Sequence, residues 1–145
     1  MNQIFLATHG HMASGVKSSL DLLIGTTQHI TTFDAYVDNR NLEEELNQFF
    51  LTCTEEDVAL LITDLYGGSV HNQLTAHITR HNTFLISGFN LAFLLELCVN
   101  PQINITLEKL LALIEESKMM FRYVSTTDFQ TEIADEDIFN EEVTS

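Results

Sequence analysis

A histidine and an aspartate each follow a short apolar segment of the sequence, and together they suit phosphoryl chemistry. His9 comes just after the apolar run 4–7, and Asp64 comes directly after the apolar run 58–63. A neutral imidazole attacks phosphorus readily near neutral pH, and a carboxylate on its other ring nitrogen fixes the tautomer and stabilises the cation that forms. The pair therefore predicts a tele-phosphohistidine, with the phosphoryl group on Nε2 of His9 and Asp64 orienting the ring.

Small residues beside this pair predict an anion site built without arginine. Glycines permit tight turns whose N–H groups face an anion, and a serine at the start of a helix offers a hydroxyl. Such a site is needed because the chain has 6 Lys and Arg against 21 Asp and Glu, a formal net charge of −15. We expect the phosphoryl group to be bound by Gly10, Gly67, Gly68 and Ser69.

Other interpretations of the same residues remain open at this point. Asp64 can be a turn cap, and a Gly-Gly pair is only a turn in most chains. A metal site is a further alternative, because imidazole and carboxylate suit zinc or iron and the candidate ligands would be His9, His11, His71 and Asp64. A short loop directs alternate residues such as His9 and His11 apart, so we expect neither a metal nor another cofactor.

The composition predicts one acidic globular domain in the cytoplasm. A length of 145 residues with 45% hydrophobic residues fits a single domain with its own core. The negative charge disfavours nucleic acid and anionic lipid as partners and favours a basic protein. Cys53 and Cys98 are far apart within apolar stretches, which is typical of free thiols in a reducing compartment. No apolar run approaches the roughly 20 residues of a membrane-spanning helix.

Alternating strand and helix signals predict an α/β fold, a doubly wound and mainly parallel sheet in three αβα layers. Strands are expected at 4–7, 30–33, 58–63 and 83–87, with the third at the centre of the sheet because it is apolar at nearly every position. Five helices are expected. The first covers about 14–24, and the second follows an N-cap at Asn41. The third runs from an N-cap at Ser69 to about 80, the fourth from an N-cap at Asn90 to about 99, and the fifth begins after Thr106.

The expected fold places the candidate residues at one edge of the sheet. Ligand sites of open parallel sheets form outside the carboxyl ends of the strands, where neighbouring crossovers go to opposite faces. If the first and third strands are neighbours, His9 and Asp64 leave the sheet side by side. The loop after the fourth strand, 88–90, should lie near them.

The C-terminal part of the sequence predicts a short strand followed by a tail. Residues 119–124 are expected to form a last short strand, which would gain hydrogen bonds by adding to a sheet edge. Residues 126–145 contain seven acidic residues and neither Lys nor Arg, so we expect a loosely ordered acidic tail there and a single domain over residues 1–125.

Three segments of the sequence resemble the IIA proteins of the mannose–fructose–sorbose class of the phosphoenolpyruvate-dependent sugar phosphotransferase system. These are Thr8-His9-Gly10, then Asp64-Leu65-Tyr66-Gly67-Gly68-Ser69 with Asn72 after it, and Gly88-Phe89-Asn90. The likeness covers roughly residues 1–123. Position 11 lies outside the family's essential pattern, so His11 inherits no role from it.

The resemblance implies a phosphocarrier of sugar uptake. His9 would accept a phosphoryl group from the basic carrier HPr and pass it to a IIB component, with the membrane components IIC and IID involved only indirectly. Asp64 would hydrogen-bond His9, and Ser69 would lie near the phosphoryl group. The family is commonly dimeric through an exchanged C-terminal strand, so the resemblance implies that residues 119–124 form an antiparallel edge strand exchanged in a homodimer. The IIB component is expected to be a separate protein.

Other functions fit parts of the same pattern. A phosphotransfer subunit of a dihydroxyacetone kinase has a similar domain, but Thr8-His9-Gly10 with the Gly-Gly-Ser loop favours the transporter. A receiver-like signalling module shares the doubly wound sheet, yet it needs an acidic pair after the first strand and a lysine directly after a late strand. Neither follows the expected strands 4–7 and 83–87. A metal hydrolase is the third alternative. The sequence does not indicate which sugar is transported.

Overall fold

Four parallel strands form the sheet of this protein, whose computed structural model describes residues 1–130. The strands are β1 (Asn2–His9), β2 (Ile30–Ala35), β3 (Val58–Thr63) and β4 (Thr83–Ser87), in the order β2-β1-β3-β4. All three pairings are parallel, which confirms the predicted α/β class. Of the predicted tail, residues 131–145 lie outside the described residues.

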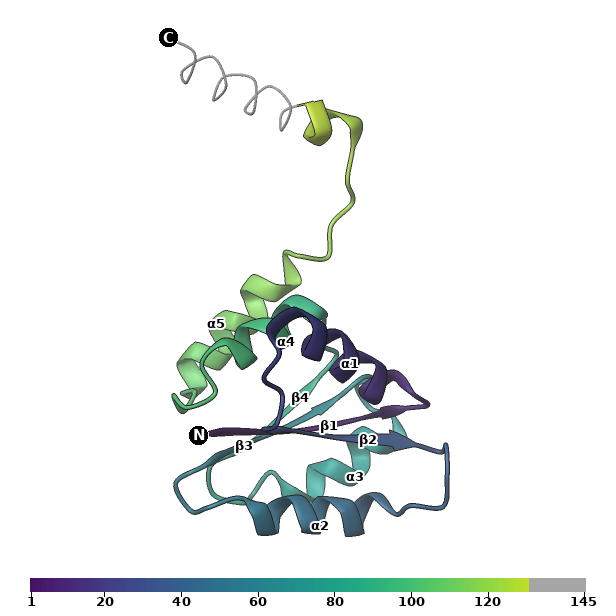
Figure 1. Cartoon of the computed structure of the whole chain (residues 1–145), viewed down its shortest axis with the longest axis vertical. Coiled ribbons are helices and arrows are strands. Elements are labelled where there is room, and N and C mark those ends of the chain that lie inside the picture. Colours follow the sequence, from purple (N-terminus) through teal and green to yellow (C-terminus); the bar gives the residue numbers. More distant parts are fainter. Residues whose placement is uncertain (131–145) are drawn as a thin grey trace.

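Helices cover both faces of the sheet, as the three-layer prediction requires (Figure 1). One face carries α1 (Met12–Ile24), α4 (Leu91–Val99) and α5 (Leu107–Lys118), and the other carries α2 (Leu42–Thr52) and α3 (Ser69–Leu74). The crossover from β1 therefore goes to one face and the crossover from β3 to the other. Since β1 and β3 are neighbours, the topological switch point lies between them, as a doubly wound sheet places it. Within residues 1–130, no helix is long and apolar enough to cross a membrane.

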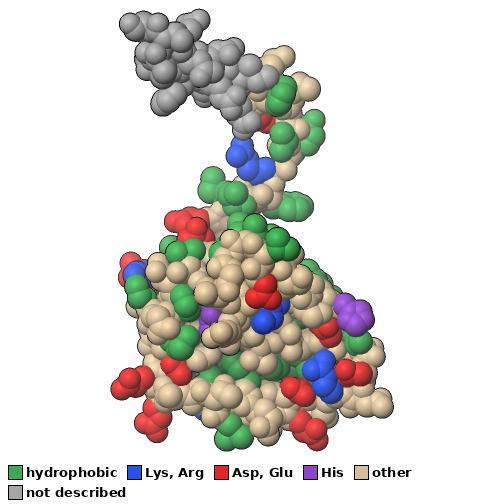
Figure 2. Space-filling view, in the orientation of Figure 1, with side chains coloured by type: hydrophobic (Ala, Val, Ile, Leu, Met, Phe, Trp, Pro, Cys, Tyr) green, Lys and Arg blue, Asp and Glu red, His purple; other side chains and the backbone are tan. Residues whose placement is uncertain are grey.

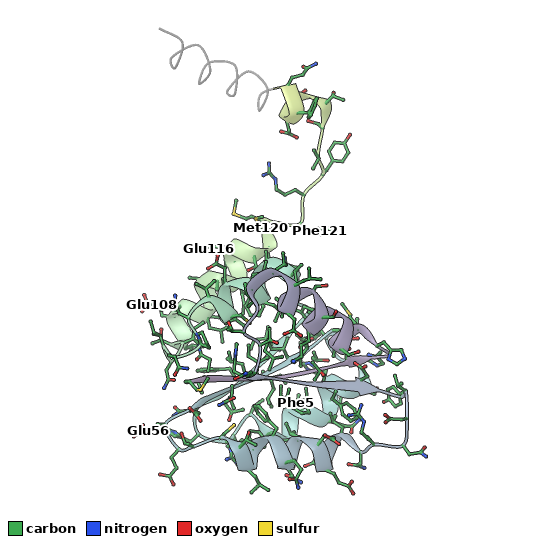
Figure 3. All side chains as sticks on the ribbon, in the orientation of Figure 1. Phe5, Glu56, Glu108, Glu116, Met120 and Phe121 are labelled. Carbon is green, nitrogen blue, oxygen red and sulfur yellow. The ribbon has the colours of Figure 1, made fainter. Side chains whose placement is uncertain are left out.

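The two central strands anchor two hydrophobic layers. All six residues of β3 are buried, which confirms its predicted central place. Along β1, alternate side chains enter opposite layers. Phe5 packs toward α2, where its ring centroid lies 5.3 Å from that of Phe49 (Figure 3), and Leu6 belongs to the layer under α1 and α4. A rigid buried pair of strands thus carries the residues at their carboxyl ends.

Side-chain caps fix the start of three helices where the sequence predicts them. Asn41 accepts hydrogen bonds from the backbone of α2 at 2.9 and 3.2 Å, and Asn90 accepts one from Phe93 N–H at 2.9 Å. Thr106 accepts one from Lys109 N–H at 3.3 Å at the start of α5. Each cap satisfies a backbone donor that lacks a partner in the first turn.

The prediction for the third helix is wrong in two respects. Its N-cap is Gly68 and not Ser69, because the Ser69 hydroxyl contacts side chains of neighbouring loops instead of its own helix. The helix also ends at Leu74, and a 3₁₀ turn over Thr75–His77 follows. The Thr75 hydroxyl donates to Asn72 O at 2.6 Å, a local bond of the kind that competes with helix continuation.

Residues 119–124 form no strand within the single chain. The backbone N–H groups of Met119, Met120 and Phe121 close the end of α5, and the chain then leaves the body at Met120 and Phe121 (Figures 1 and 3). Apolar side chains line this departing arm in the space-filling view (Figure 2), and Phe121 is 93% exposed. Residues 126–130 are helical. An exchanged strand would need a second copy of the chain, so it stays a prediction.

Candidate functional site

The register of the strands brings His9 and Asp64 together. Ala7 of β1 pairs with Thr63 of β3, so the residues that follow, including His9 and Asp64, emerge side by side. On the other flank, His9 itself pairs with Ala35 of β2. The predicted adjacency of the first and third strands is therefore confirmed, and both residues lie at the switch point.

The Asp64 carboxylate holds His9 through the backbone and through the ring. Oδ2 accepts a hydrogen bond from His9 N–H at 3.0 Å and lies 3.0 Å from Nδ1 of the imidazole. Oδ1 lies 3.2 Å from the same Nδ1 and accepts the Thr63 hydroxyl at 3.2 Å. An ionised carboxylate can only accept, so Nδ1 carries the proton and Nε2 keeps its lone pair. The His9 side chain is 38% exposed, which leaves the ring accessible from solvent.

Hydrogen bonding keeps Asp64 ionised. Partial burial raises the pKa of this carboxyl, but the backbone N–H of His9, the bond from its ring and the attraction of an imidazolium act in the opposite direction. The net result is a pKa below the ordinary value for aspartate. A carboxylate that stays charged through neutral pH can stabilise a cation on His9.

Ser69 lies on the other side of the imidazole. Its Oγ is 3.4 Å from Nε2 of His9 and 2.6 Å from the hydroxyl of Tyr36. Gly68 lies close to the ring, since a Cβ built there would be in ordinary contact with His9 Cε1 at 3.5 Å, and glycine relieves a tighter contact of 3.3 Å with the backbone oxygen of Leu65 in its own loop. Nε2 of His9 thus faces a hydroxyl group at the surface.

Two of the glycines expected to bind phosphate form backbone hydrogen bonds in the loops. Gly10 N–H donates to Ala35 O at 3.0 Å, and Gly68 N–H donates to Leu65 O at 3.2 Å. Both N–H groups therefore have a backbone partner, and binding of the phosphoryl group by these glycines stays a prediction. Gly67 adopts a φ of +73°, the left-handed turn that a residue without Cβ favours.

A second histidine–aspartate pair lies next to the first. His11 Nδ1 is 3.3 Å from Asp34 Oδ2, and Asp34 also accepts Ser14 N–H at 3.0 Å and the Ser14 hydroxyl at 2.5 Å. Partial burial raises the pKa of Asp34, but the bonds from Ser14 and His11 outweigh it and the pKa lies below the ordinary value. Asp34 thus stabilises the start of α1 and stays ionised.

The metal alternative is not supported by this arrangement. His11 contacts Asp34, and the His71 ring lies against Tyr66 with 4.9 Å between ring centroids, so neither joins His9 and Asp64. Within the described part of the chain, no group of three His, Cys, Asp or Glu side chains is placed to hold a metal ion.

Tyr36 and Asp34 are residues of this site region that sequence reasoning missed. Both come from the end of β2, whose neighbour in the sheet is β1. The available signal was positional, because every strand of a parallel sheet delivers its carboxyl end to the same edge. The loop after the second strand therefore lies at the same edge of the sheet as the other three.

Comparison with known proteins gives one family and a consistent set of structures. The sequence matches the family described as the PTS system fructose IIA component over residues 3–115, whereas no curated protein matches the chain. A structure from Klebsiella pneumoniae, assigned as a permease of the phosphoenolpyruvate-dependent sugar phosphotransferase system, is 26% identical. The alignment covers 84% of this chain and 90% of that one, with a TM-score of 0.75.

Two further structures share the fold at lower identity. The phosphotransferase system component EIIA from Streptococcus agalactiae is 23% identical over 88% of this chain and 99% of that one, with a TM-score of 0.70. The mannose/sorbose-specific IIA subunit from Enterococcus faecalis is 20% identical over 86% and 95%, with a TM-score of 0.71. The family match spans most of the chain, and the fold agrees with it. This chain belongs to the PTS fructose IIA component family and is a phosphocarrier of a sugar phosphotransferase system.

Proposed function

We propose that the chain accepts a phosphoryl group from HPr on Nε2 of His9 and passes it to a IIB component. The observation that carries this proposal is the imidazole held between Asp64 at Nδ1 and Ser69 at Nε2. The carboxylate fixes the tautomer that leaves a lone pair on the solvent-facing nitrogen. His9 is thereby prepared as a nucleophile without any change of protonation.

The transfer itself exchanges one phosphorus–nitrogen bond for another. The Nε2 lone pair of His9 attacks phosphorus while the P–N bond of the donor histidine breaks, and that electron pair returns to the donor ring. Nδ1 keeps its proton, so His9 becomes a cation that Asp64 stabilises at 3.0 Å. Transfer to IIB runs through the same steps, with His9 now the leaving group.

The surroundings of His9 suit a protein partner with basic character. Met12 begins α1, and Val37 and Leu65 lie in the loops after β2 and β3. These three side chains are 47%, 40% and 59% exposed, which gives the site an apolar rim. Exposed apolar side chains around a polar centre are typical of protein-binding surfaces. The formal charge of −15 attracts a basic carrier such as HPr and accelerates its encounter.

The assembly and compartment that we propose follow from the same family relation. Strand β4 ends the sheet with one unpaired edge, and residues 119–124 supply an exposed segment in which Phe121, Tyr123 and Val124 are 93%, 89% and 74% exposed. Addition of this segment to β4 of a second copy would give the edge of β4 its hydrogen-bond partners and would bury the exposed side chains of the segment, which produces a homodimer. The protein would act in the cytoplasm. It would not contact the membrane components IIC and IID directly, because the phosphoryl group would reach them only through IIB.

The competing function is not favoured. A dihydroxyacetone kinase subunit would use a similar domain, but the solved structures that this chain resembles are components of sugar phosphotransferase systems.

Labelling with phosphoenolpyruvate, enzyme I and HPr tests the proposal. The wild-type chain should take one acid-labile phosphoryl group per molecule, and His9→Ala should abolish labelling while the circular dichroism stays unchanged. The matched control is His11→Ala, which removes the neighbouring imidazole of the second histidine–aspartate pair and should leave most of the label. Labelling that survives the loss of His9 would contradict the proposal.

A further inference from the structure

Tyr36 contacts both the imidazole of His9 and the hydroxyl of Ser69, which lies on the Nε2 side of that ring. Its ring centroid is 5.7 Å from that of the imidazole, with 31° between the ring planes. Its neighbour Ala35 accepts the hydrogen bond from Gly10 N–H at 3.0 Å, which ties the chain after β2 to the loop after His9. The sheet therefore places Tyr36 beside the imidazole.

The backbone of Tyr36 adopts an unfavourable conformation. Its φ is +66°, and Asn82 is the only other non-glycine residue with a positive φ in the described part of the chain. An aromatic residue in the left-handed region is strained, and residues of this kind cluster at functional sites. Burial does not compensate the strain, since Tyr36 is 69% exposed. In this conformation the side chain makes its ring contact with His9 and its hydrogen bond with Ser69.

The three polar groups form a directed chain of hydrogen bonds. Nδ1 of His9 donates to Asp64, so Nε2 can only accept. The Ser69 hydroxyl, 3.4 Å away, has one proton and donates it to Nε2. Its oxygen can then only accept from Tyr36, whose hydroxyl lies at 2.6 Å. The direction runs from tyrosine to serine to histidine.

We propose that Tyr36 is a positioning residue for phosphoryl transfer, whose hydroxyl holds the Ser69 hydroxyl at Nε2 of His9; this inference rests on the proposed function of His9. When the P–N bond of the donor breaks and Nε2 binds phosphorus, Nε2 can no longer accept a hydrogen bond. The Ser69 hydroxyl then turns to a phosphoryl oxygen while Tyr36 keeps its oxygen in place. Two neutral hydroxyls thereby support the phosphoryl group in a chain of high negative charge.

A double-variant cycle tests whether Tyr36 acts through Ser69. Tyr36→Phe keeps the ring and removes only the hydroxyl, and it should slow single-turnover transfer from phospho-HPr about two- to tenfold, the range for one uncharged hydrogen bond. The same substitution in a Ser69→Ala background should have no further effect. Tyr66→Phe is the matched control, because Tyr66 is 82% exposed with its ring against His71, and its rate should equal that of the wild type.

Nitrogen NMR gives a readout that a merely structural role would not move. The ¹⁵N shift of His9 Nε2 reports the hydrogen bond accepted there, and Tyr36→Phe should move it toward the value of a free imidazole nitrogen while Tyr66→Phe leaves it unchanged. An equal loss of rate in both Ser69 backgrounds, or no loss, overturns the inference. If wild-type protein takes no label, the proposed function fails and the inference fails with it; if wild type and Tyr36→Phe are labelled equally fast, only the inference fails.

Discussion

Replacing Asp64 by Asn removes the charge beside His9 while keeping the size of the side chain. In the structure, Oδ2 accepts both the backbone N–H and Nδ1 of His9, at 3.0 Å each. The backbone donor favours the amide oxygen at this position, so the variant can still hold the ring in the same tautomer. The amide NH₂ then replaces Oδ1, which lies 3.2 Å from Nδ1. The substitution therefore exchanges an attractive contact for a repulsive one and removes the counter-charge of the cation.

The expected cost follows from these contacts. Two unit charges about 4 Å apart near a protein surface attract each other by ~4 kcal/mol at an effective dielectric constant of about 20. Solvent around His9, which is 38% exposed, reduces that attraction, and the amide oxygen retains part of the hydrogen bond. We expect the barrier for transfer to rise by ~1.5–3 kcal/mol, which is a rate loss of roughly tenfold to 150-fold.

Rapid-quench measurement of transfer from phospho-HPr checks this value. Asp34→Asn is the matched control, since it makes the same change in the neighbouring pair with His11. It should keep most of the transfer rate, and its main effect should be a lower stability of α1, whose first turn Asp34 caps through Ser14 N–H. Circular dichroism should be near native for both variants. An Asp64→Asn variant that is phosphorylated at the wild-type rate would show that Asp64 is only a turn cap.

Two further predictions concern stability and assembly. Burial lowers the pKa of His29, with a smaller effect from Lys17, so the folded state binds fewer protons than the unfolded chain. The free energy of unfolding should therefore fall as pH drops below about 6.5. In urea titrations His29→Gln should flatten this pH dependence, and an equally steep dependence would refute the assignment to His29. Deleting residues 121–145 keeps the closing bonds of α5 at Met119 and Met120, yet it should convert the proposed dimer to monomers or poorly soluble protein in sedimentation runs, whereas a dimer of unchanged affinity would place the interface elsewhere.

The sequence predicts the layout of the site because that layout depends on local patterns. Apolar runs locate the strands, asparagine caps locate helix starts, and the rule for parallel sheets places His9 and Asp64 at one edge. The 3.0 Å contact between them in the structure agrees with this placement. Residue type and strand order therefore suffice to predict the position of a residue that directly follows a strand.

Contacts between loops are the part that the sequence leaves open. Tyr36 has a positive φ and contacts His9 and Ser69, which are distant in the sequence, and a lone tyrosine after a strand carries no local signal for either feature. The N–H of Gly10 donates to Ala35 O, a partner on another strand that the sequence does not indicate. Ser69 looks like a helix cap in the sequence, but in the structure its hydroxyl contacts Tyr36 and His9. Both cases involve a polar group with several possible partners, among which only the tertiary structure decides.

The position of the phosphoryl group is the central claim, and NMR of the phosphorylated protein tests it most directly. Protein labelled with ¹⁵N in its histidines and phosphorylated through HPr should show a single phosphorus resonance coupled to Nε2 of His9, with Nδ1 still protonated and hydrogen-bonded to Asp64. Coupling to Nδ1 of His9, to either nitrogen of His11, or to any other residue would contradict the mechanism.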